Sequence, residues 1–100
     1  MSATGGKKSG GDSVSREFTV KNKLGIHARP AAMFVKTANK FRADIHVEKD
    51  GQEINGKSIM GLMMLAAGQG SVLKITADGE DSSKAIKEIE LLIERKFDED

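Results

Sequence analysis

The apolar residues of this chain switch repeatedly between two spacings, and this switching restricts the possible folds more than any other feature of the sequence. Apolar and polar residues alternate in three segments, as in half-buried strands: 17–21, 43–48 and 73–77. Asp50 and Gly51 form a strong hairpin signal, so a further short strand is predicted over 52–55. The chain is therefore expected to contain one sheet of four strands.

Three segments between and after these strands have the three- and four-residue apolar spacing of amphipathic helices. The first is predicted over 30–41 and begins with a proline, whose missing N–H has no partner to lose there. The second follows Ser58, a favourable N-cap residue. The last is capped by Asp81 or Ser82, and its buried stripe extends to Phe97. The order β-α-β-β-α-β-α places all three helices on one face of the sheet, which is an open-faced α+β architecture.

The first 16 residues differ in composition from the rest of the chain. They contain four Gly and four Ser, and they cannot bury enough apolar surface to offset the entropy of ordering them. We therefore predict a flexible extension over 1–16 and one domain over 17–100. No apolar run approaches the roughly 20 residues that cross a bilayer, and no apolar stretch follows Lys7 and Lys8, as a secretory signal requires. We expect a cytoplasmic protein without membrane insertion.

The charge balance and the few reactive side chains exclude several classes of function. The chain has 16 Lys and Arg against 15 Asp and Glu, a formal net charge of +1, which gives no electrostatic case for nucleic-acid binding. It has no Cys and two histidines, His27 and His46. His46 is expected on the exposed polar face of its strand, without a role. Because no thiol or carboxylate completes a site with the histidines, we expect neither a metal nor a cofactor.

His27 stands directly before the predicted first helix, which makes it the candidate reactive residue. The first turn of a helix has free backbone N–H groups, here those of Ala28 and Arg29, and together with the helix dipole they form an anion site. The Arg29 guanidinium adds a fixed charge suited to a phosphoryl group. A neutral imidazole nitrogen can attack a phosphorus atom, and these groups would hold the resulting anion. Gly25 allows the tight backbone that exposes the ring.

Two segments carry a resemblance to a known family. LGIHARPAA, at 24–32, resembles the phosphorylation-site motif of the histidine-containing phosphocarrier (HPr) family of the phosphoenolpyruvate-dependent phosphotransferase system. GKSIMGLMML, at 56–65, resembles a second signature of that family, at the family's spacing. The resemblance extends over 17–100 with the same element order. It implies a four-stranded antiparallel sheet covered on one face by three helices.

The resemblance also implies roles for individual residues. His27 would accept a phosphoryl group on Nδ1 from enzyme I and pass it to an enzyme IIA domain for sugar uptake. Arg29 would contact the phosphate and the partners, and Pro30 would start the helix. Ser58 would be phosphorylated by a serine kinase/phosphorylase. A protein of this kind is a stoichiometric carrier with a phosphohistidine intermediate and is not itself an enzyme.

The second predicted helix has more apolar residues than one buried stripe can use, so we expect Met60 and Met64 to be exposed. Exposed methionines suit a surface that binds several partners. The expected docking residues are Ile26, Lys57, Ile59, Met60, Met63 and Met64. The expected partners are enzyme I, enzyme IIA domains, a serine kinase/phosphorylase and a transcriptional regulator, and the chain is expected to be a monomer.

Two branches of the family remain open. Leu24 and the acidic ending 97–100 resemble the nitrogen-related branch, whereas the segment 56–65 resembles the sugar-transport branch. The alternative to a sugar-transport carrier is therefore a nitrogen-related or purely regulatory paralogue that acts by docking partner proteins. A purely regulatory paralogue would be expected to lack His27.

Residues 51–58, GQEINGKS, also match the P-loop pattern G-x-x-x-x-G-K-[ST] letter for letter. We reject nucleotide binding because Gly51 belongs to the predicted hairpin turn and the residues between the glycines are predicted to form a strand. Glu53 would also repel phosphates. The chain is too short for the sheet that surrounds a P-loop.

Overall fold

The computed structural model of the protein describes residues 12–99. The elements follow the predicted order, and their bounds are β1 (Ser13–Thr19), α1 (Ala28–Ala38), β2 (Asp44–Lys49), β3 (Gln52–Asn55), α2 (Ile59–Met64), β4 (Val72–Asp78), α3 (Ser82–Glu94) and a short helical turn, η2 (Lys96–Asp98). The β-α-β-β-α-β-α prediction is confirmed, with η2 as an addition.

The four strands form one antiparallel sheet in the order β1-β4-β2-β3. β4 runs between the first two strands of the chain and pairs with both. β2 and β3 form the predicted hairpin, because Asp50 and Gly51 both adopt the positive φ, 52° and 83°, that a two-residue turn of this kind requires. The two edges of the sheet are therefore β1 and β3.

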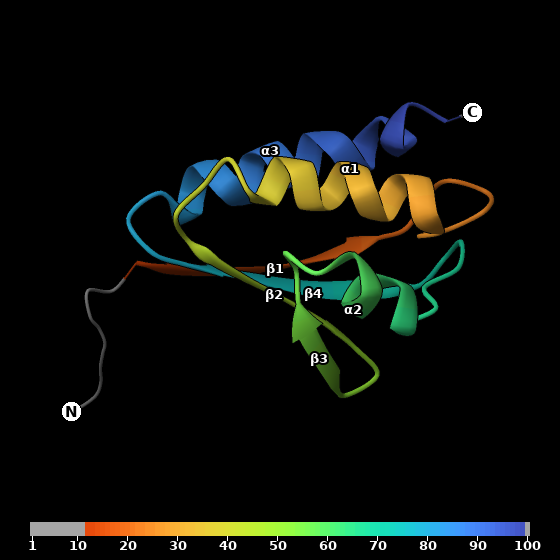
Figure 1. Cartoon of the computed structure of the whole chain (residues 1–100), viewed down its shortest axis with the longest axis horizontal. Helices are drawn as coiled ribbons and strands as arrows, with labels where there is room; N and C mark the ends of the chain where they lie inside the picture. Colours follow the sequence, from red (N-terminus) through yellow and green to blue (C-terminus); the bar gives the residue numbers. More distant parts are fainter. Residues whose placement is uncertain (1–11, 100) are drawn as a thin grey trace.

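The helices and the sheet enclose one core. α1 and α3 lie side by side over the same face of the sheet (Figure 1), and α2 packs against α1 and β3. Alternate residues of β2 and β4 meet the helices, and the largest fully buried side chains are Phe34, Phe97, Ile45, Leu62, Leu73, Ile75, Ile86, Ile89, Leu92, Ile93, Val20 and Val47. Over residues 12–99, no helix has the length and apolar character needed to cross a membrane.

β1 begins four residues earlier than predicted, at Ser13 instead of Glu17. Its whole length pairs with β4, from Ser13 opposite Asp78 to Thr19 opposite Val72. Backbone pairing extends the strand there, where the apolar pattern gives no signal. Residues 13–16, which we expected in the N-terminal extension, therefore belong to the sheet. Asp12 precedes the strand, and residues 1–11 of that predicted extension lie outside the described residues.

α1 begins at Ala28 and ends at Ala38, so the predicted start at Pro30 and end at 41 are wrong. Pro30 is the third residue of the helix, and it is compatible with this place because first-turn N–H groups have no partner within the helix. Phe41 follows the helix, and its half-buried ring still packs against the core.

α2 and α3 are also shorter than their apolar patterns predicted. α2 ends at Met64, and Ala66 has a φ of 51°, which ends the helix. Phe97 is fully buried, as expected, but it lies in η2 beyond the end of α3. An apolar residue beyond a helix end can reach the core when the chain turns back, and residue spacing alone does not reveal such a turn.

Asp81 stands at the N-cap of α3, as one of the two predicted caps, but its side chain does not cap the helix. The carboxylate instead accepts hydrogen bonds from the backbone N–H groups of Arg42 and Ala43, each at 2.9 Å. These bonds tie the start of α3 to the residues that lead into β2.

Candidate functional site

His27 occupies the N-cap of α1 with extended backbone angles, φ −82° and ψ −169°. Its carbonyl accepts the first intrahelical hydrogen bond, from Ala31 N at 3.0 Å, but its side chain makes no capping hydrogen bond. The imidazole, 38% exposed, is therefore not used to cap the helix, while the backbone of the same residue holds the helix start.

The backbone after His27 is the first turn of α1, where the anion site was predicted. Ala28 and Arg29 are the first two residues of α1 and are exposed, and the N–H groups at this position have no intrahelical partner. Pro30 follows without an N–H and is buried. A phosphoryl group on His27 would thus meet two backbone donors, the positive end of the helix dipole and the exposed Arg29 side chain.

The backbone conformation of the loop before His27 is fixed by contacts of Asn22, Gly25 and Ile26. Gly25 has a φ of +70°, and a Cβ on it would clash with the carbonyl oxygen of Ala67 and lie 2.7 Å from Gly68 Cα. Ile26 N donates to the same Ala67 oxygen at 2.8 Å. The buried amide of Asn22 closes the loop by donating from Nδ2 to Gly25 O at 2.7 Å. The glycine was singled out from the sequence, whereas Asn22 was not.

The structure adds a residue that the sequence analysis did not place at the site. Glu99 lies beside His27, with Oε2 2.8 Å from Nε2 of the imidazole. Its second oxygen, Oε1, accepts from Asn22 Nδ2 at 3.0 Å, and the side chain is only 13% exposed. Figure 1 shows the C-terminal turn beside the loop that enters α1. The acidic C-terminal residues were visible in the sequence. Nothing in the sequence indicated that one of them would contact His27.

The surroundings of Glu99 favour its ionised form. Burial alone would raise the pKa of this carboxyl. The hydrogen bonds from Asn22 and His27 and the positive charge of Arg29 have the opposite effect, and the net result is a pKa of Glu99 below its ordinary value. His27, Arg29 and Glu99 therefore form one group of interacting polar side chains at the N-terminus of α1.

Two of the six expected docking residues are corrected by the structure. Ile26 is 6% exposed and belongs to the core, because its side chain points inward where the loop packs against the segment after α2. Lys57 is half-buried, and its Nζ donates to Phe41 O at 2.8 Å, so its charge is directed toward the protein.

The other four expected docking residues are exposed on α2. Met60 and Met64 are 75% and 66% exposed, as predicted, and Ile59 and Met63 are also exposed. Leu24, in the loop before His27, is exposed as well. Because α2 packs against α1, this apolar surface lies on the helix next to the one that begins at His27. We call Ile59, Met60, Met63 and Met64 the α2 patch.

Ser58 is the N-cap of α2, as predicted. Its backbone is extended, and its Oγ accepts a hydrogen bond from Gly61 N at 3.0 Å. The preceding residues confirm that the P-loop match has no structural meaning, because Gly51 lies in the hairpin turn and β3 occupies the residues between the two glycines.

His46 was expected to be exposed and is half-exposed on β2. Its Nδ1 lies 3.2 Å from Oε2 of Glu53, a residue of the neighbouring strand β3. This pair is on the β2–β3 hairpin and not at the N-terminus of α1.

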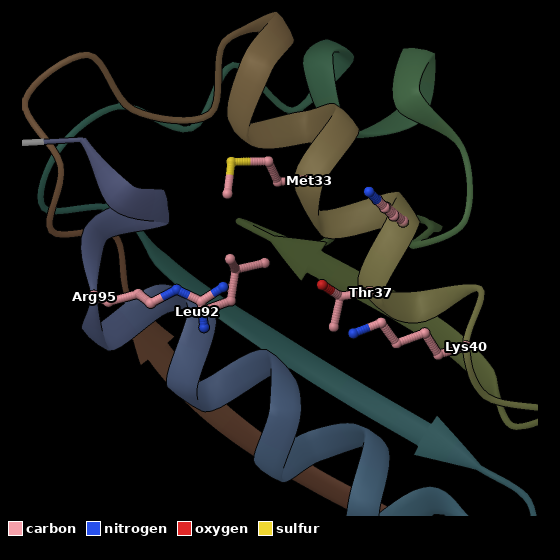
Figure 2. A pocket seen from close by; sticks show the side chains of 6 residues that line it. Met33, Thr37, Lys40, Leu92 and Arg95 are labelled. Atoms are coloured by element: carbon pink, nitrogen blue, oxygen red, sulfur yellow. The ribbon is translucent and has the colours of Figure 1, made fainter.

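A cavity of about 240 Å³ lies between α1 and α3. Figure 2 shows Thr37 on α1 and Lys40 in the turn that follows this helix, with Leu92 on α3 and Arg95 at its C-cap. The lining residues are Met33, Lys36, Thr37, Lys40, Leu92 and Arg95. His27 is not among them, so the candidate reactive histidine lies on the open surface and not in this cavity.

A family comparison agrees with the geometry around His27. The sequence profile of a family described as "PTS HPr component phosphorylation site" matches residues 14–95. The chain belongs to the HPr family of phosphocarrier proteins. The HPr match begins within β1, which supports the inclusion of residues 14–16 in the fold.

Individual members of the HPr family match nearly their whole length. Phosphocarrier protein HPr of Xylella fastidiosa is 46% identical over 87 residues, which cover 87% of this chain and 98% of the relative. The HPr-like protein Crh of Halalkalibacterium halodurans is 46% identical over 83 residues, 83% of this chain and 99% of the relative. A crystal structure of HPr-C-His from Thermoanaerobacter tengcongensis is 52% identical, with a TM-score of 0.84, and covers 87% of this chain and 98% of that one.

Proposed function

We propose that the chain is a phosphocarrier of the phosphoenolpyruvate-dependent phosphotransferase system, which accepts a phosphoryl group on His27 from enzyme I and passes it to enzyme IIA components for sugar uptake. The observation that carries this proposal is the position of His27 at the N-cap of α1. Its side chain is released from capping, and the free N–H groups of the next two residues are beside it.

The transfer step uses the imidazole as the nucleophile. A lone pair of Nδ1 forms a bond to phosphorus while the bond from phosphorus to the donor's leaving atom breaks, and that atom keeps the electron pair. The phosphoryl oxygens then face the N–H groups of Ala28 and Arg29 and the Arg29 guanidinium. Transfer to the next protein is the same exchange in the opposite direction, with His27 as the leaving group.

The surface location of His27 fits a carrier that must meet large partners. An exposed imidazole can enter the active site of another protein, whereas a nucleophile inside a closed cavity serves small substrates. The α2 patch offers exposed apolar side chains for such contacts. In this proposal the patch contacts enzyme I and enzyme IIA in turn, and the chain itself turns over no substrate.

The proposal is tested with labelled phosphoenolpyruvate and enzyme I. The wild-type chain should acquire an acid-labile phosphate, because phosphohistidine is the expected product, and His27→Ala should acquire none. His46→Ala is the matched control, since it removes the chain's other histidine, and it should be labelled like the wild type. An unlabelled wild type, or a His27→Ala variant that still accepts the label, would refute the proposal.

A regulatory role through phosphorylation of Ser58 is the second candidate function. The position of Ser58 at the start of α2 favours this role. Ser58 caps α2 directly before the α2 patch, so a phosphate there would place up to two negative charges beside the docking surface. A protein that acts only through such docking would have no need of a reactive histidine, and the presence of His27 favours the carrier role. A serine kinase/phosphorylase and a transcriptional regulator are the partners that this second role requires.

The branch and the assembly state belong to the same proposal. We place the chain in the sugar-transport branch, in the cytoplasm and as a monomer. To decide the branch, the rate of phosphorylation of the chain is measured with enzyme I of the sugar-transport system and with enzyme I of the nitrogen-related system. Faster phosphorylation by the first supports the sugar-transport branch. Dimers are described for HPr of Thermoanaerobacter tengcongensis and Crh of Bacillus subtilis, so light scattering of the purified chain tests the monomer directly.

A further inference from the structure

We propose that Glu99 is a positioning residue, which holds the proton of His27 on Nε2 and so presents Nδ1 as the nucleophile. The inference rests on the proposed phosphocarrier function and deepens it. It begins from the contact of 2.8 Å between Glu99 Oε2 and His27 Nε2.

The chemistry of this contact decides where the proton is. An ionised carboxylate only accepts hydrogen bonds, so Nε2 must be the donor. A neutral imidazole has one N–H, and if Nε2 carries it, Nδ1 has the free lone pair. The carboxylate thus selects one of the two tautomers and also restrains the rotation of the ring.

Glu99 is itself held from two sides. Oε1 accepts from Nδ2 of Asn22, whose buried amide also binds Gly25 O in the loop before His27. On the other side, Glu99 N donates to Lys96 O at 2.9 Å within the turn that follows α3. The buried ring of Phe97 anchors this turn to the core. The carboxylate is therefore fixed relative to the same loop that carries its target histidine.

The charge of Glu99 also suits the product of the transfer. When Nδ1 binds phosphorus while Nε2 keeps its proton, the ring becomes positively charged. A carboxylate at the opposite ring nitrogen stabilises that charge. Glu99 would also repel the phosphoryl oxygens, but Arg29 lies close enough to interact with the Glu99 charge and offsets this repulsion. The arrangement resembles the carboxylate–histidine pairs that orient ligands in metal sites.

The test combines ring NMR with phosphorylation rates. Nitrogen-15 spectra of the full chain, recorded at mildly alkaline pH, should show a protected Nε2–H in the wild type. Glu99→Ala should lose that protected proton, and enzyme I should phosphorylate this variant about tenfold more slowly, the lower end of the loss seen when a metal-bound histidine loses its hydrogen-bond partner. Glu99→Gln should recover part of the rate, since its amide oxygen still accepts a hydrogen bond.

Glu94→Gln is the matched control, because it neutralises a carboxylate at the end of α3 that pairs with Lys21 at 2.8 Å and not with His27. It should keep both the protected proton and the wild-type rate. A wild type whose ring proton is on Nδ1, or a Glu99→Ala variant phosphorylated at the wild-type rate, would overturn the inference. A wild type that accepts no phosphoryl group would instead refute the proposed function, so the two failures are distinguishable.

Discussion

At the scale of single residues, the two N-cap residues His27 and Ser58 differ in whether the side chain makes a capping hydrogen bond. Ser58 uses its oxygen to cap α2, whereas His27, in the same kind of position on α1, leaves its side chain out of the cap. Its ring meets Glu99 through Nε2 only. The loop before His27 sets the position of this ring, and Gly25 in that loop cannot be replaced without strain.

Gly25→Ala should destabilise the fold by about 2 kcal/mol or more, because the new Cβ requires a left-handed backbone and also clashes with the Ala67 carbonyl. Gly70→Ala is the matched control, since Gly70 has a φ of +89° but no atom within 4 Å of a Cβ. Urea denaturation of both variants measures the difference. Equal losses would show that the contact with Ala67 contributes nothing.

At the scale of elements, the ends of the helices hold the parts of the site and of the fold together. His27 is the N-cap residue of α1 and Asp81 is that of α3. η2 follows α3 and leads to Glu99, which contacts His27. Lys96, Phe97 and Asp98 all have a positive φ, a conformation that costs L-residues about 1–2 kcal/mol each. The buried Phe97 ring is the interaction in a position to offset that cost.

Phe97→Ala should therefore cost about 3–5 kcal/mol of folding free energy, as for other buried Phe residues, and should release η2. The protected Nε2–H of His27 should be lost with it. Leu91→Ala, a truncation at a half-exposed position of α3, should cost less than about 1 kcal/mol and leave the ring proton in place. If Phe97→Ala keeps the ring proton, η2 does not position Glu99.

The Asp81 carboxylate should make stability depend on pH. The hydrogen bond from Arg42 N outweighs the opposing effect of burial, and the bond from Ala43 N adds to it, so the pKa of Asp81 is lowered on folding. A lowered pKa stabilises the fold above the unfolded-state pKa, and this contribution is lost as the pH falls through the folded-state pKa. The stability difference between wild type and Asp81→Asn should thus be larger at about pH 6 than at about pH 3.

Denaturation at both pH values checks this prediction. Asp78→Asn, at an exposed position of β4, is the control and should have a much smaller effect on stability. The stability difference between wild type and Asp81→Asn could instead grow as the pH falls. That result would contradict the conclusion that the ionised carboxylate accepts these hydrogen bonds.

At the scale of the whole molecule, a nearly neutral chain presents a small exposed apolar patch. The net charge is +1, so no strong field acts over the whole surface to attract one class of partner. The exposed apolar side chains of the α2 patch lie on the helix next to α1. A carrier that binds and leaves several proteins is well served by such a limited patch, because weak interfaces release their partners quickly.

Ser58→Asp should slow the phosphorylation of His27 by enzyme I, because the added charge lies at the edge of the α2 patch. The capping bond to Gly61 can be kept by the aspartate, so the fold should be retained. Initial labelling rates and the midpoint of thermal unfolding measure the two effects separately. Ser58→Asn is the uncharged control, and an aspartate variant that is labelled as fast as this control would contradict the idea.

The sequence predicted the elements because their signals are local. The alternation around Ile45 and Ile75 and the helical spacing in α1 and α3 each act within a few residues, and the structure agrees. Contacts between distant positions could not be predicted in this way. The start of β1 depends on its pairing with β4, and the contact of His27 with Glu99 joins residues 72 positions apart. Ile26 was predicted as a docking residue, but it is buried because the loop turns its side chain inward.

The measurement that tests the carrier role most directly is the return of the phosphoryl group. The chain is labelled with phosphoenolpyruvate and enzyme I, purified, and then mixed with enzyme I and unlabelled pyruvate. If His27 holds a transferable phosphoryl group, the label should leave the chain and reappear in phosphoenolpyruvate. A label that stays on the chain under these conditions, or that is found on a residue other than His27, would contradict the account.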